Sequence, residues 1–361
     1  MKWKLLKKRQ FPIGIDLGTA AAKLVQLVDL GGQMELTAAA YLDLPEELQK
    51  NVSGRLEFLE GRLGGLLRQG GFQGRKCVMS LPPSDTFLAH VRVPKVPSSQ
   101  MEGVLRGELE GKLPFDVFQS VIRHLVAGEA EAGSTLEVIA VATPRRLVDQ
   151  FAGMAERAGL ELLALDVEPC AILECFGRLL RRAEDAERAT LFLDIGQSFS
   201  QVVIALGARM VFARNLPMGG RQIDQAVAKV LNMPLAEVMG LRRSLAGQKP
   251  NPQSQFVYDA LRDSLNALAG EITQCLRYYE SVFPSHPVER SIFLGGGALD
   301  HNLCQQMAQR LNLPAQIGDP LLRIGRRFTM PAPAGMDRRQ ANPAWAVAVG
   351  LCLGSQISVA A

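Results

Sequence analysis

The sequence has no long apolar run. None of its 361 residues falls in an uninterrupted apolar stretch of the roughly 18 to 20 residues that a transmembrane helix requires, and the N-terminus lacks the apolar core of a signal peptide. We therefore expect the protein to stay in the cytoplasm. Its hydrophobic content of 47% is enough for more than one core, and chains of this length usually divide into two or more domains.

Disulfide, metal-binding and nucleic-acid-binding patterns are also missing. The six cysteines contain no Cys-x-x-Cys pair, and the four histidines do not stand near them at the spacing of a metal site, so we expect reduced, mostly buried thiols. The net charge is only +4, with no basic patch typical of nucleic-acid binding. Residues 1–9, with five basic side chains beside Trp3, Leu5 and Leu6, suit contact with an anionic membrane surface and equally suit a solvated tail.

Three glycine-containing segments are the most informative feature that is present. They are Gly14-Ile-Asp-Leu-Gly-Thr19, Leu193-Asp-Ile-Gly-Gln-Ser198 and Leu294-Gly-Gly-Gly-Ala298. The first two share one pattern: an apolar strand reaches an Asp, and then come one apolar residue, a Gly and a small or polar residue. A repeated strand and turn predicts two related halves around one cleft.

The first two segments have the residues that a phosphate group and its metal ion need. Gly14, Gly18 and Gly196 lack Cβ, so the backbone turns sharply and its amides can approach phosphate oxygens. Asp16 and Asp194 are expected to end neighbouring buried strands, where two facing carboxylates need a cation. We expect Mg²⁺, because few carboxylates hold it together with water and substrate phosphates.

Further groups complete the predicted nucleotide site. Thr19 and Ser198 offer hydroxyls, and Lys23 offers an ammonium within reach of phosphate. The bare backbone of 295–297 suits the flat faces of adenine and ribose. Leu216-Pro-Met-Gly-Gly220 leads into an apolar-periodic helix, so its glycines are expected at a positive helix N-terminus. One strand-Asp-Gly turn is common in α/β proteins, whereas this series of segments is hard to obtain by chance.

With these motifs the chain resembles the actin-like ATPase superfamily, and within it the PilM family of type IV pilus assembly proteins, a relative of FtsA. The resemblance spans nearly the whole chain. It also includes Asp166-Val-Glu-Pro-Cys-Ala171 and Asn342-Pro-Ala-Trp-Ala-Val-Ala-Val-Gly-Leu351, which look like the two connecting helices of the superfamily, and Val211-Phe-Ala-Arg-Asn-Leu-Pro-Met-Gly-Gly-Arg-Gln222. It implies the α/β actin-like ATPase fold, a duplicated ribonuclease H-like fold with two lobes around a nucleotide cleft.

The resemblance also implies a division of the chain. We expect a first lobe from residues 1–75, 167–188 and 340–361, with an inserted α+β subdomain over 76–166. The second lobe is expected from 189–222 and 284–339, with a helical subdomain over 223–283.

The family implies ATP and Mg²⁺ as ligands. Glu168 matches the position of a residue that positions the attacking water in some members, although beside Pro169 it equally fits a carboxylate that stabilises a helix start. Glu271 stands where relatives hold the ribose or base, and a solvated helix face is the alternative. Asp16 and Asp194 are the expected metal residues, and the expected nucleotide contacts are Asp16, Gly18, Thr19, Ala20, Lys23, Asp194, Gly196, Ser198, Gly219, Gly220, Gln222, Glu271, Gly295, Gly296, Gly297 and Leu299.

One departure from the family bears on activity. PilM-like proteins usually have a run of serines after the first turn, whereas here Thr19 is followed by Ala20-Ala21-Ala22. Fewer hydroxyls then face the phosphates. We expect ATP binding with slow or absent hydrolysis.

The family implies a protein partner. PilM-like proteins hold the short cytoplasmic N-terminal segment of the inner-membrane protein PilN in a groove beside the inserted subdomain, and so connect to other inner-membrane and cytoplasmic pilus assembly proteins. This implies a cytoplasmic protein that is peripheral at the inner membrane. Within the alternating stretch 86–93 we expect Phe87, Ala89 and Val91 to contribute to the groove, although such alternation also marks an ordinary half-buried strand.

Three other functions share these motifs. An FtsA-type filament protein would end in an amphipathic membrane helix, whereas residues 354–361 are short and uncharged. A small-metabolite kinase needs a positioned substrate base, and no second Asp-bearing loop demands that role. The counterpart in type II secretion is normally continuous with a transmembrane helix.

Overall fold

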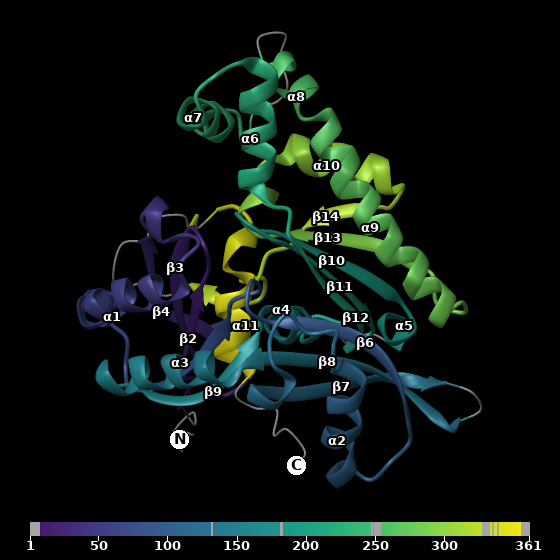
Figure 1. Ribbon diagram of the computed structural model, residues 1–361. Coiled ribbons are helices and arrows are strands. Elements are labelled where there is room, and N and C mark those ends of the chain that lie inside the picture. Colours follow the sequence, from purple (N-terminus) through teal and green to yellow (C-terminus); the bar gives the residue numbers. More distant parts are fainter. Residues whose placement is uncertain are drawn as a thin grey trace, which may run out of the picture.

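The computed structural model describes residues 8–130, 133–180, 183–246, 248, 254–326, 333, 336, 337 and 339–354. These residues form two large sheets, a smaller third sheet and the helices around them (Figure 1). Most of the predicted membrane-contact segment 1–9 and nearly all of the tail 354–361 lie outside the described residues.

The first lobe is built on a seven-stranded sheet. Its strands follow the order β15-β4-β3-β2-β5-β9, and β1 pairs with β3 beside this path. Helices α1 (Val52–Gln69) and α3 (Arg145–Arg157) pack against one face through a shared apolar cluster. The strands are β1 (Lys8–Gln10), β2 (Ile13–Leu17), β3 (Ala21–Leu30), β4 (Met34–Asp43), β5 (Lys76–Leu81), β9 (Glu161–Val167) and β15 (Gly325–Arg326).

The second lobe repeats this topology. Its sheet has the order β12-β11-β10-β13-β14, which corresponds strand for strand to β4-β3-β2-β5-β9 of the first lobe. The first three strands of each lobe are antiparallel and the others parallel. The strands are β10 (Ala189–Ile195), β11 (Ser200–Leu206), β12 (Arg209–Leu216), β13 (Val288–Leu294) and β14 (Ala315–Ile317).

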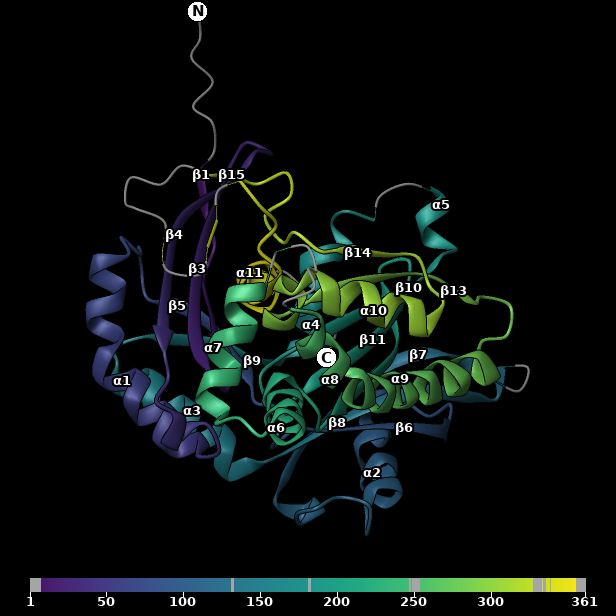
Figure 2. The same cartoon turned by 90° about the horizontal axis from the view of Figure 1, so that it is seen from above.

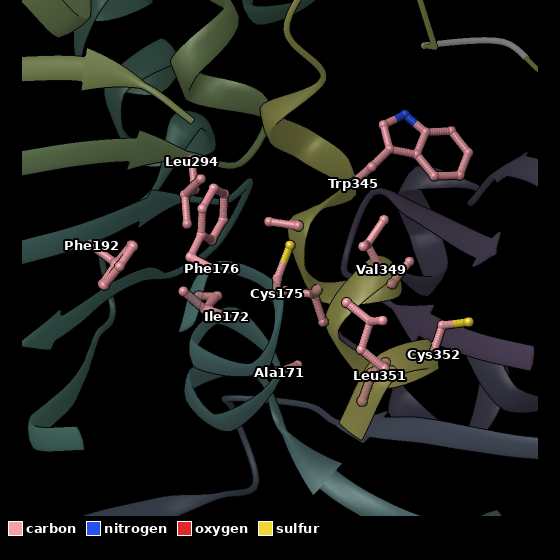
Figure 3. Close-up of a cluster of buried hydrophobic side chains, with 14 of the residues drawn as sticks. Ala171, Ile172, Cys175, Phe176, Phe192, Leu294, Trp345, Val349, Leu351 and Cys352 are labelled. Atoms are coloured by element: carbon pink, nitrogen blue, oxygen red, sulfur yellow. The ribbon is translucent and has the colours of Figure 1, made fainter. Parts of the chain in front are cut away.

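Two helices lie between the sheets and join the lobes (Figures 2 and 3). They are α4 (Glu168–Gly177) and α11 (Ala346–Gly354), and their apolar side chains belong to one buried cluster with strands of both lobes. A Cβ on Gly350 would collide with the backbone of Ala171, so the two helices cross so closely that only glycine fits at this position. These helices begin within the two segments predicted as connecting helices.

The inserted subdomain is smaller than predicted. Its sheet, β6-β8-β7, consists of β6 (Phe87–Pro94), β7 (Ser120–Ala130) and β8 (Thr135–Pro144), and α2 (Ser98–Leu109) packs on it. The range 76–166 also contains β5, α3 and β9, yet β5 pairs with β2 and β9 pairs with β5 in the first-lobe sheet. A strand's own residues do not reveal its neighbour, because pairing is decided by distant segments.

The helical subdomain of the second lobe comes between β12 and β13. It contains α6 (Gly220–Leu231), α7 (Leu235–Leu245), α8 (Gln255–Ala260) and α9 (Arg262–Val282), and α10 (His301–Leu311) follows β13. Short helical turns occur at η1 (Glu46–Leu48), η2 (Val117–Gln119), α5 (Ala183–Ala186), η4 (Gly296–Leu299) and η5 (Pro343–Trp345).

Two expectations from composition can be compared with the structure. All six cysteines are free, and five of them are buried, as predicted. None of the helices in the described part of the chain has both the length and the apolar character needed to cross a bilayer.

Candidate functional site

The two predicted aspartates lie near the ends of equivalent strands. Asp16 is on β2 and Asp194 on β10, and their exposed fractions are only 4% and 8%. The Nζ atom of Lys23 lies 2.9 Å from Asp16 Oδ2. Burial, partly offset by Lys23 and reinforced by Asp16, raises the pKa of Asp194 to about 7. Two carboxylates therefore share a region that favours an added cation.

The turns after these strands have the same geometry. A Cβ on Gly18 would lie 3.0 Å from the carbonyl oxygen of Ala21, and one on Gly196 would lie 2.8 Å from that of Phe199. The amide of Gly196 donates to this Phe199 oxygen at 2.9 Å. Each turn therefore needs glycine three positions before the residue that closes it.

The second turn is held by the start of α6. The amide of Gly220 donates to Gly196 O, and the amide of Arg221 donates to Gln197 O, both at 2.8 Å. A Cβ on Gly219 would lie 2.6 Å from Gly196 O. The helix N-terminus that we expected to face phosphate thus uses two amides to support the turn.

Gln222 also supports the second turn. Its Oε1 accepts from the amide of Gly219 at 3.0 Å, and its Nε2 donates to Ser198 O at 3.1 Å. The side chain thus connects the glycine pair to the turn.

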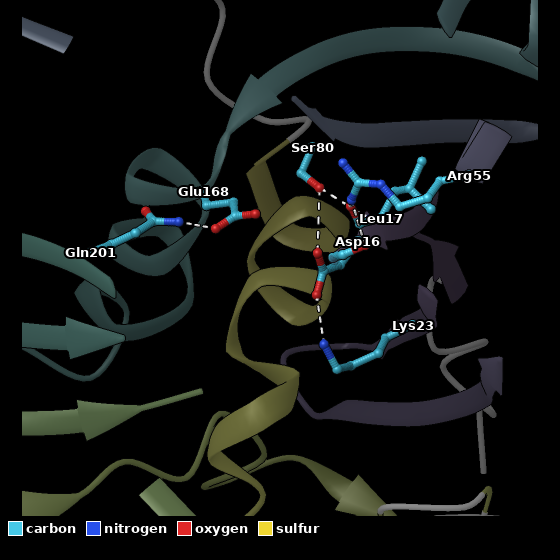
Figure 4. Close-up of polar contacts among 8 residues, drawn as sticks. Asp16, Leu17, Lys23, Arg55, Ser80, Glu168 and Gln201 are labelled. Carbon is cyan, nitrogen blue, oxygen red and sulfur yellow. Dashed lines mark hydrogen bonds and ion pairs between the residues drawn. The ribbon is translucent and has the colours of Figure 1, made fainter. Parts of the chain in front are cut away.

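The first turn is held by two side chains that the sequence analysis did not single out (Figure 4). The hydroxyl of Ser80 on β5 accepts from the amide of Leu17 at 3.3 Å and donates to Asp16 Oδ1 at 3.4 Å. Nη1 of Arg55, on α1, donates to Leu17 O at 3.2 Å and to Gly18 O at 2.7 Å. The pairing of β5 with β2 brings Ser80 to the turn, and the packing of α1 on the sheet brings Arg55 there.

Glu168 begins α4 and faces the same region (Figure 4). Removal from water, followed by the negative charges of Asp16 and Asp194, raises the pKa of Glu168 well above its usual value. Nε2 of Gln201 donates to its carboxyl group. Gln201 pairs with Asp194 in the sheet register as Lys23 pairs with Asp16. This repeat was readable in the sequence, since each follows its aspartate by seven positions.

The third glycine segment packs on the end of β10. Gly295 has a φ of 77°, and a Cβ there would collide with Asp194. A Cβ on Gly297 would lie 2.5 Å from Ile195 Cγ2, whereas one on Gly296 would meet nothing within 4 Å. The exposed fraction of Leu299, at the end of η4, is 45%. The structure therefore brings the second and third segments together.

A cavity of about 670 Å³ opens between the lobes beside these turns. Thr19 and Ser198 line the cavity from the two turns. Ala20 follows Thr19 in the chain, and the carbonyl oxygen of Ala20 accepts from the amide of Leu44. Arg221 spans the lobes here, with Nη2 lying 2.6 Å from Glu46 Oε1 and Nη1 lying 3.0 Å from Gln49 Oε1. The other lining residues are Glu47, Lys50, Ser84, Phe199, Pro217, Gln222 and Gln225.

Some predicted residues have other surroundings. Glu271 lies on α9 with its Oε2 atom 3.8 Å from Nη2 of Arg214, and no contact among the described residues connects it to the glycine turns. Val91 is buried in the core between β6 and α2, and Phe87 and Ala89 pack against that core. These three side chains face their own subdomain, because alternation marks the buried face of a strand but not what covers it.

A separate hollow lies where the inserted subdomain meets the first lobe. Its volume is about 410 Å³, and it lies between the starts of α1 and α3 and the loop before β6. Its lining residues are Lys50, Asn51, Val52, Ser53, Ser84, Asp85, Pro144, Arg146, Leu147 and Gln150. Lys50 and Ser84 line both this hollow and the cavity between the lobes.

The residues present fit a nucleotide with Mg²⁺. Within the described ranges, no group of three or more His, Cys, Asp or Glu side chains could hold a metal ion alone, so the two aspartates would need phosphate oxygens and water to complete the ion's shell. Buried polar atoms without a partner lie in the same region, namely Arg55 Nε, Gln197 Nε2 and Gln201 Oε1. Ordered water or a polar ligand would satisfy such atoms.

Comparisons with known proteins agree with this geometry. A family model described as type IV pilus assembly protein PilM matches residues 14–356. A solved structure, the PilM-PilN type IV pilus biogenesis complex, contains a chain that is 25% identical with a TM-score of 0.79, covering 95% of this chain and 98% of that one. The ethanolamine utilization protein EutJ from Carboxydothermus hydrogenoformans is 14% identical, with a TM-score of 0.54 and coverage of 95% and 89%. These matches confirm the predicted actin-like ATPase fold.

Proposed function

The chain belongs to the PilM family of type IV pilus assembly proteins, and we propose from this that it is an ATP-binding adaptor of pilus assembly. In this proposal it binds ATP and Mg²⁺ between its lobes and captures the cytoplasmic N-terminal segment of PilN beside the inserted subdomain. Partner binding then places it at the cytoplasmic face of the inner membrane, where it connects to other assembly proteins.

The observation that carries the proposal is the likeness, over 95% of this chain, to a chain of the PilM-PilN type IV pilus biogenesis complex. It is supported by the two equivalent turns, each with a buried aspartate before it. A filament protein or a metabolite kinase of the superfamily would share the turns but not this family match.

The nucleotide would be held by groups from both lobes. Asp16 and Asp194 would face the metal ion, Thr19 and Ser198 would meet phosphates, and the backbone at 295–297 would meet adenosine. Mg²⁺, when bound, supplies charge neutralisation for the phosphates. Lys23, now paired with Asp16, would be close enough to share its charge with a phosphate.

We expect this site to hydrolyse ATP slowly or not at all. A general base must be ionised and in contact with water. Glu168 instead uses its carboxyl group to accept from Gln201 Nε2, and Thr19 is followed by Ala20-Ala21-Ala22, so few polar groups are available to orient an attacking water. Bound nucleotide would then stabilise one arrangement of the lobes rather than drive a cycle.

The hollow of about 410 Å³ is the site we propose for the PilN segment. It lies beside the inserted subdomain and has polar and charged walls, including Lys50, Asp85 and Arg146. Nε2 of Gln150 on α3 donates to Ser53 Oγ on α1 at 3.2 Å, so the two helices that form its walls are connected.

The test is calorimetry of the full chain with a synthetic peptide of the PilN N-terminal segment, with and without Mg-ATP. We expect micromolar peptide binding, and a change with Mg-ATP would measure the coupling between the sites. Arg146→Glu should weaken peptide binding by about tenfold, since it reverses a charge on the wall.

Arg145→Glu is the matched control, because Arg145 is also exposed and adjacent but does not line the hollow. Equal effects of both substitutions would contradict this location. An absence of peptide binding in either condition, together with tight Mg-ATP binding, would favour the kinase or filament functions.

A further inference from the structure

Arg55 has an unusual position for an arginine. Its exposed fraction is 1%, and both of its described hydrogen bonds run from Nη1 to backbone carbonyls, those of Leu17 and Gly18 (Figure 4). Its Nε atom is buried without a partner. A buried guanidinium is normally paired with a carboxylate, because an unpaired buried charge is costly.

The helix that carries Arg55 adds to this cost. Arg55 is the fourth residue of α1, whose first turn contains no acidic side chain. The N-terminus of a helix carries partial positive charge and favours anions. The carboxylates of Glu168, Asp85 and Asp16 attract this charge, but none of them is a hydrogen-bond partner of Arg55 among the described residues. An anion held at the first turn would meet the same charge.

The second lobe shows what Arg55 does for the first. There the amides of Gly220 and Arg221, at the start of α6, donate to Gly196 O and Gln197 O and hold the turn. Gly18 and Gly196 are equivalent positions in the two lobes. Nη1 of Arg55 donates to Gly18 O, so in the first lobe this side chain takes the place of the Gly220 amide that binds Gly196 O in the second.

We propose that Arg55 is a positioning residue for a polyphosphate. Its side chain holds the first turn by two backbone carbonyls and places a buried positive charge behind that turn, with no directly bonded carboxylate among the described residues. This rests on the proposed nucleotide site. The ligand class follows from the geometry, since the charge lies behind the phosphate turn and not near the 295–297 backbone. Arg55 therefore discriminates by the number of phosphates and not by the base.

The test is calorimetric binding of ATP, ADP, AMP and adenosine, each with Mg²⁺, to the wild-type chain and to Arg55→Met. Arg55→Met removes the charged hydrogen bonds that hold the first turn, so we expect ATP affinity to fall by about tenfold or more. Adenosine affinity should change by less than about twofold, within the scatter of such measurements. Arg55→Lys keeps the positive charge but lacks the planar guanidinium, so its ATP affinity should lie between those of the wild-type chain and Arg55→Met.

Arg178→Met is the matched control, because Arg178 also donates to two backbone carbonyls, at 2.7 Å to Pro320 and 3.0 Å to Leu322, near the opposite end of α4 from Glu168. It should leave all four affinities unchanged. Equal losses for ATP and adenosine in Arg55→Met, or no loss for ATP, would overturn the inference; if Arg55→Met does not fold, the same comparison in Arg55→Lys decides. If the wild-type chain bound none of the four ligands, the proposed nucleotide site itself would be wrong.

Discussion

At the scale of single residues, the site concentrates buried charge. Asp16, Asp194 and Glu168 face Lys23 and Arg55 with little exposure to water, and burial is the largest cause of the raised pKa values of Asp194 and Glu168. Such an arrangement stabilises the empty protein poorly and suits a charged ligand.

A partly buried titratable group, His90, connects the inserted subdomain to the second lobe. Its ring stacks on Phe212 with centroids 4.4 Å apart, and its Nε2 lies 3.1 Å from Ala213 O. Burial, with a contribution from Arg214, lowers the pKa of His90 to about 4. The imidazole is therefore neutral in the native protein at pH values where the unfolded chain is protonated.

We predict that this interface loses stability in acid. Between pH 6.5 and about 4 the unfolded state binds a proton that the native state does not, so the free energy of unfolding falls as pH falls through this window. Relative to His90→Gln, the wild-type protein should lose on the order of 2 kcal/mol between pH 7 and pH 4.5. Urea unfolding at a series of pH values measures this difference. His301→Gln, at an exposed position, is the control, and parallel profiles for wild type and His90→Gln would contradict the prediction.

At the scale of elements, the helix pair α4 and α11 connects the two lobes. The backbones of the two helices are in direct contact at Gly350, where a Cβ would collide with the backbone of Ala171. Glu168 begins α4, so a shift of this pair would displace it relative to Asp16 and Asp194.

We predict that Gly350→Ala destabilises the protein. The added methyl group must separate two helices in a packed core, which typically costs about 1–3 kcal/mol. Gly61→Ala on α1 is the control, since a Cβ there meets nothing within 4 Å and alanine favours a helix by about 1 kcal/mol over glycine. Thermal unfolding should show a lower midpoint for the first substitution and an equal or higher one for the second. A Gly350→Ala protein as stable as wild type would show that the crossing can relax.

At the scale of the whole molecule, Arg221 links the two lobes across the cleft. Arg221 follows the glycine pair of the second lobe and reaches Glu46 and Gln49 of the first lobe. The chain continues from Gln49 to Lys50, which lines both the cavity between the lobes and the hollow beside the inserted subdomain. Closure of the lobes and the shape of the hollow therefore share one segment.

We predict that Arg221→Ala opens the cleft and weakens coupling between the two sites. Small-angle scattering should give a larger radius of gyration without nucleotide, and the change in peptide affinity caused by Mg-ATP should shrink. Arg188→Ala is the control, because its exposed ion pair with Glu289 of β13, at 3.4 Å, involves none of the residues that line the cavity between the lobes. The prediction fails if both variants scatter like wild type and keep the same coupling.

The site was predictable where its residues are adjacent in the chain. The two turns with Asp16 and Asp194, and the 295–297 segment, lie where glycine spacing and apolar strands placed them. Glu271 follows from the family resemblance and Val91 from the alternation of its strand, and neither source reveals the neighbour that the side chain faces.

By itself the sequence determined the elements and the duplicated turns, because apolar periodicity and glycine conformation act over a few neighbouring residues. Only the tertiary structure decided which strands share a sheet, moving β5 and β9 into the first lobe. It also brought Ser80 and Arg55 behind the first turn and Gln201 against Glu168. These contacts join residues more than 30 positions apart, and only packing of the whole chain determines such neighbours.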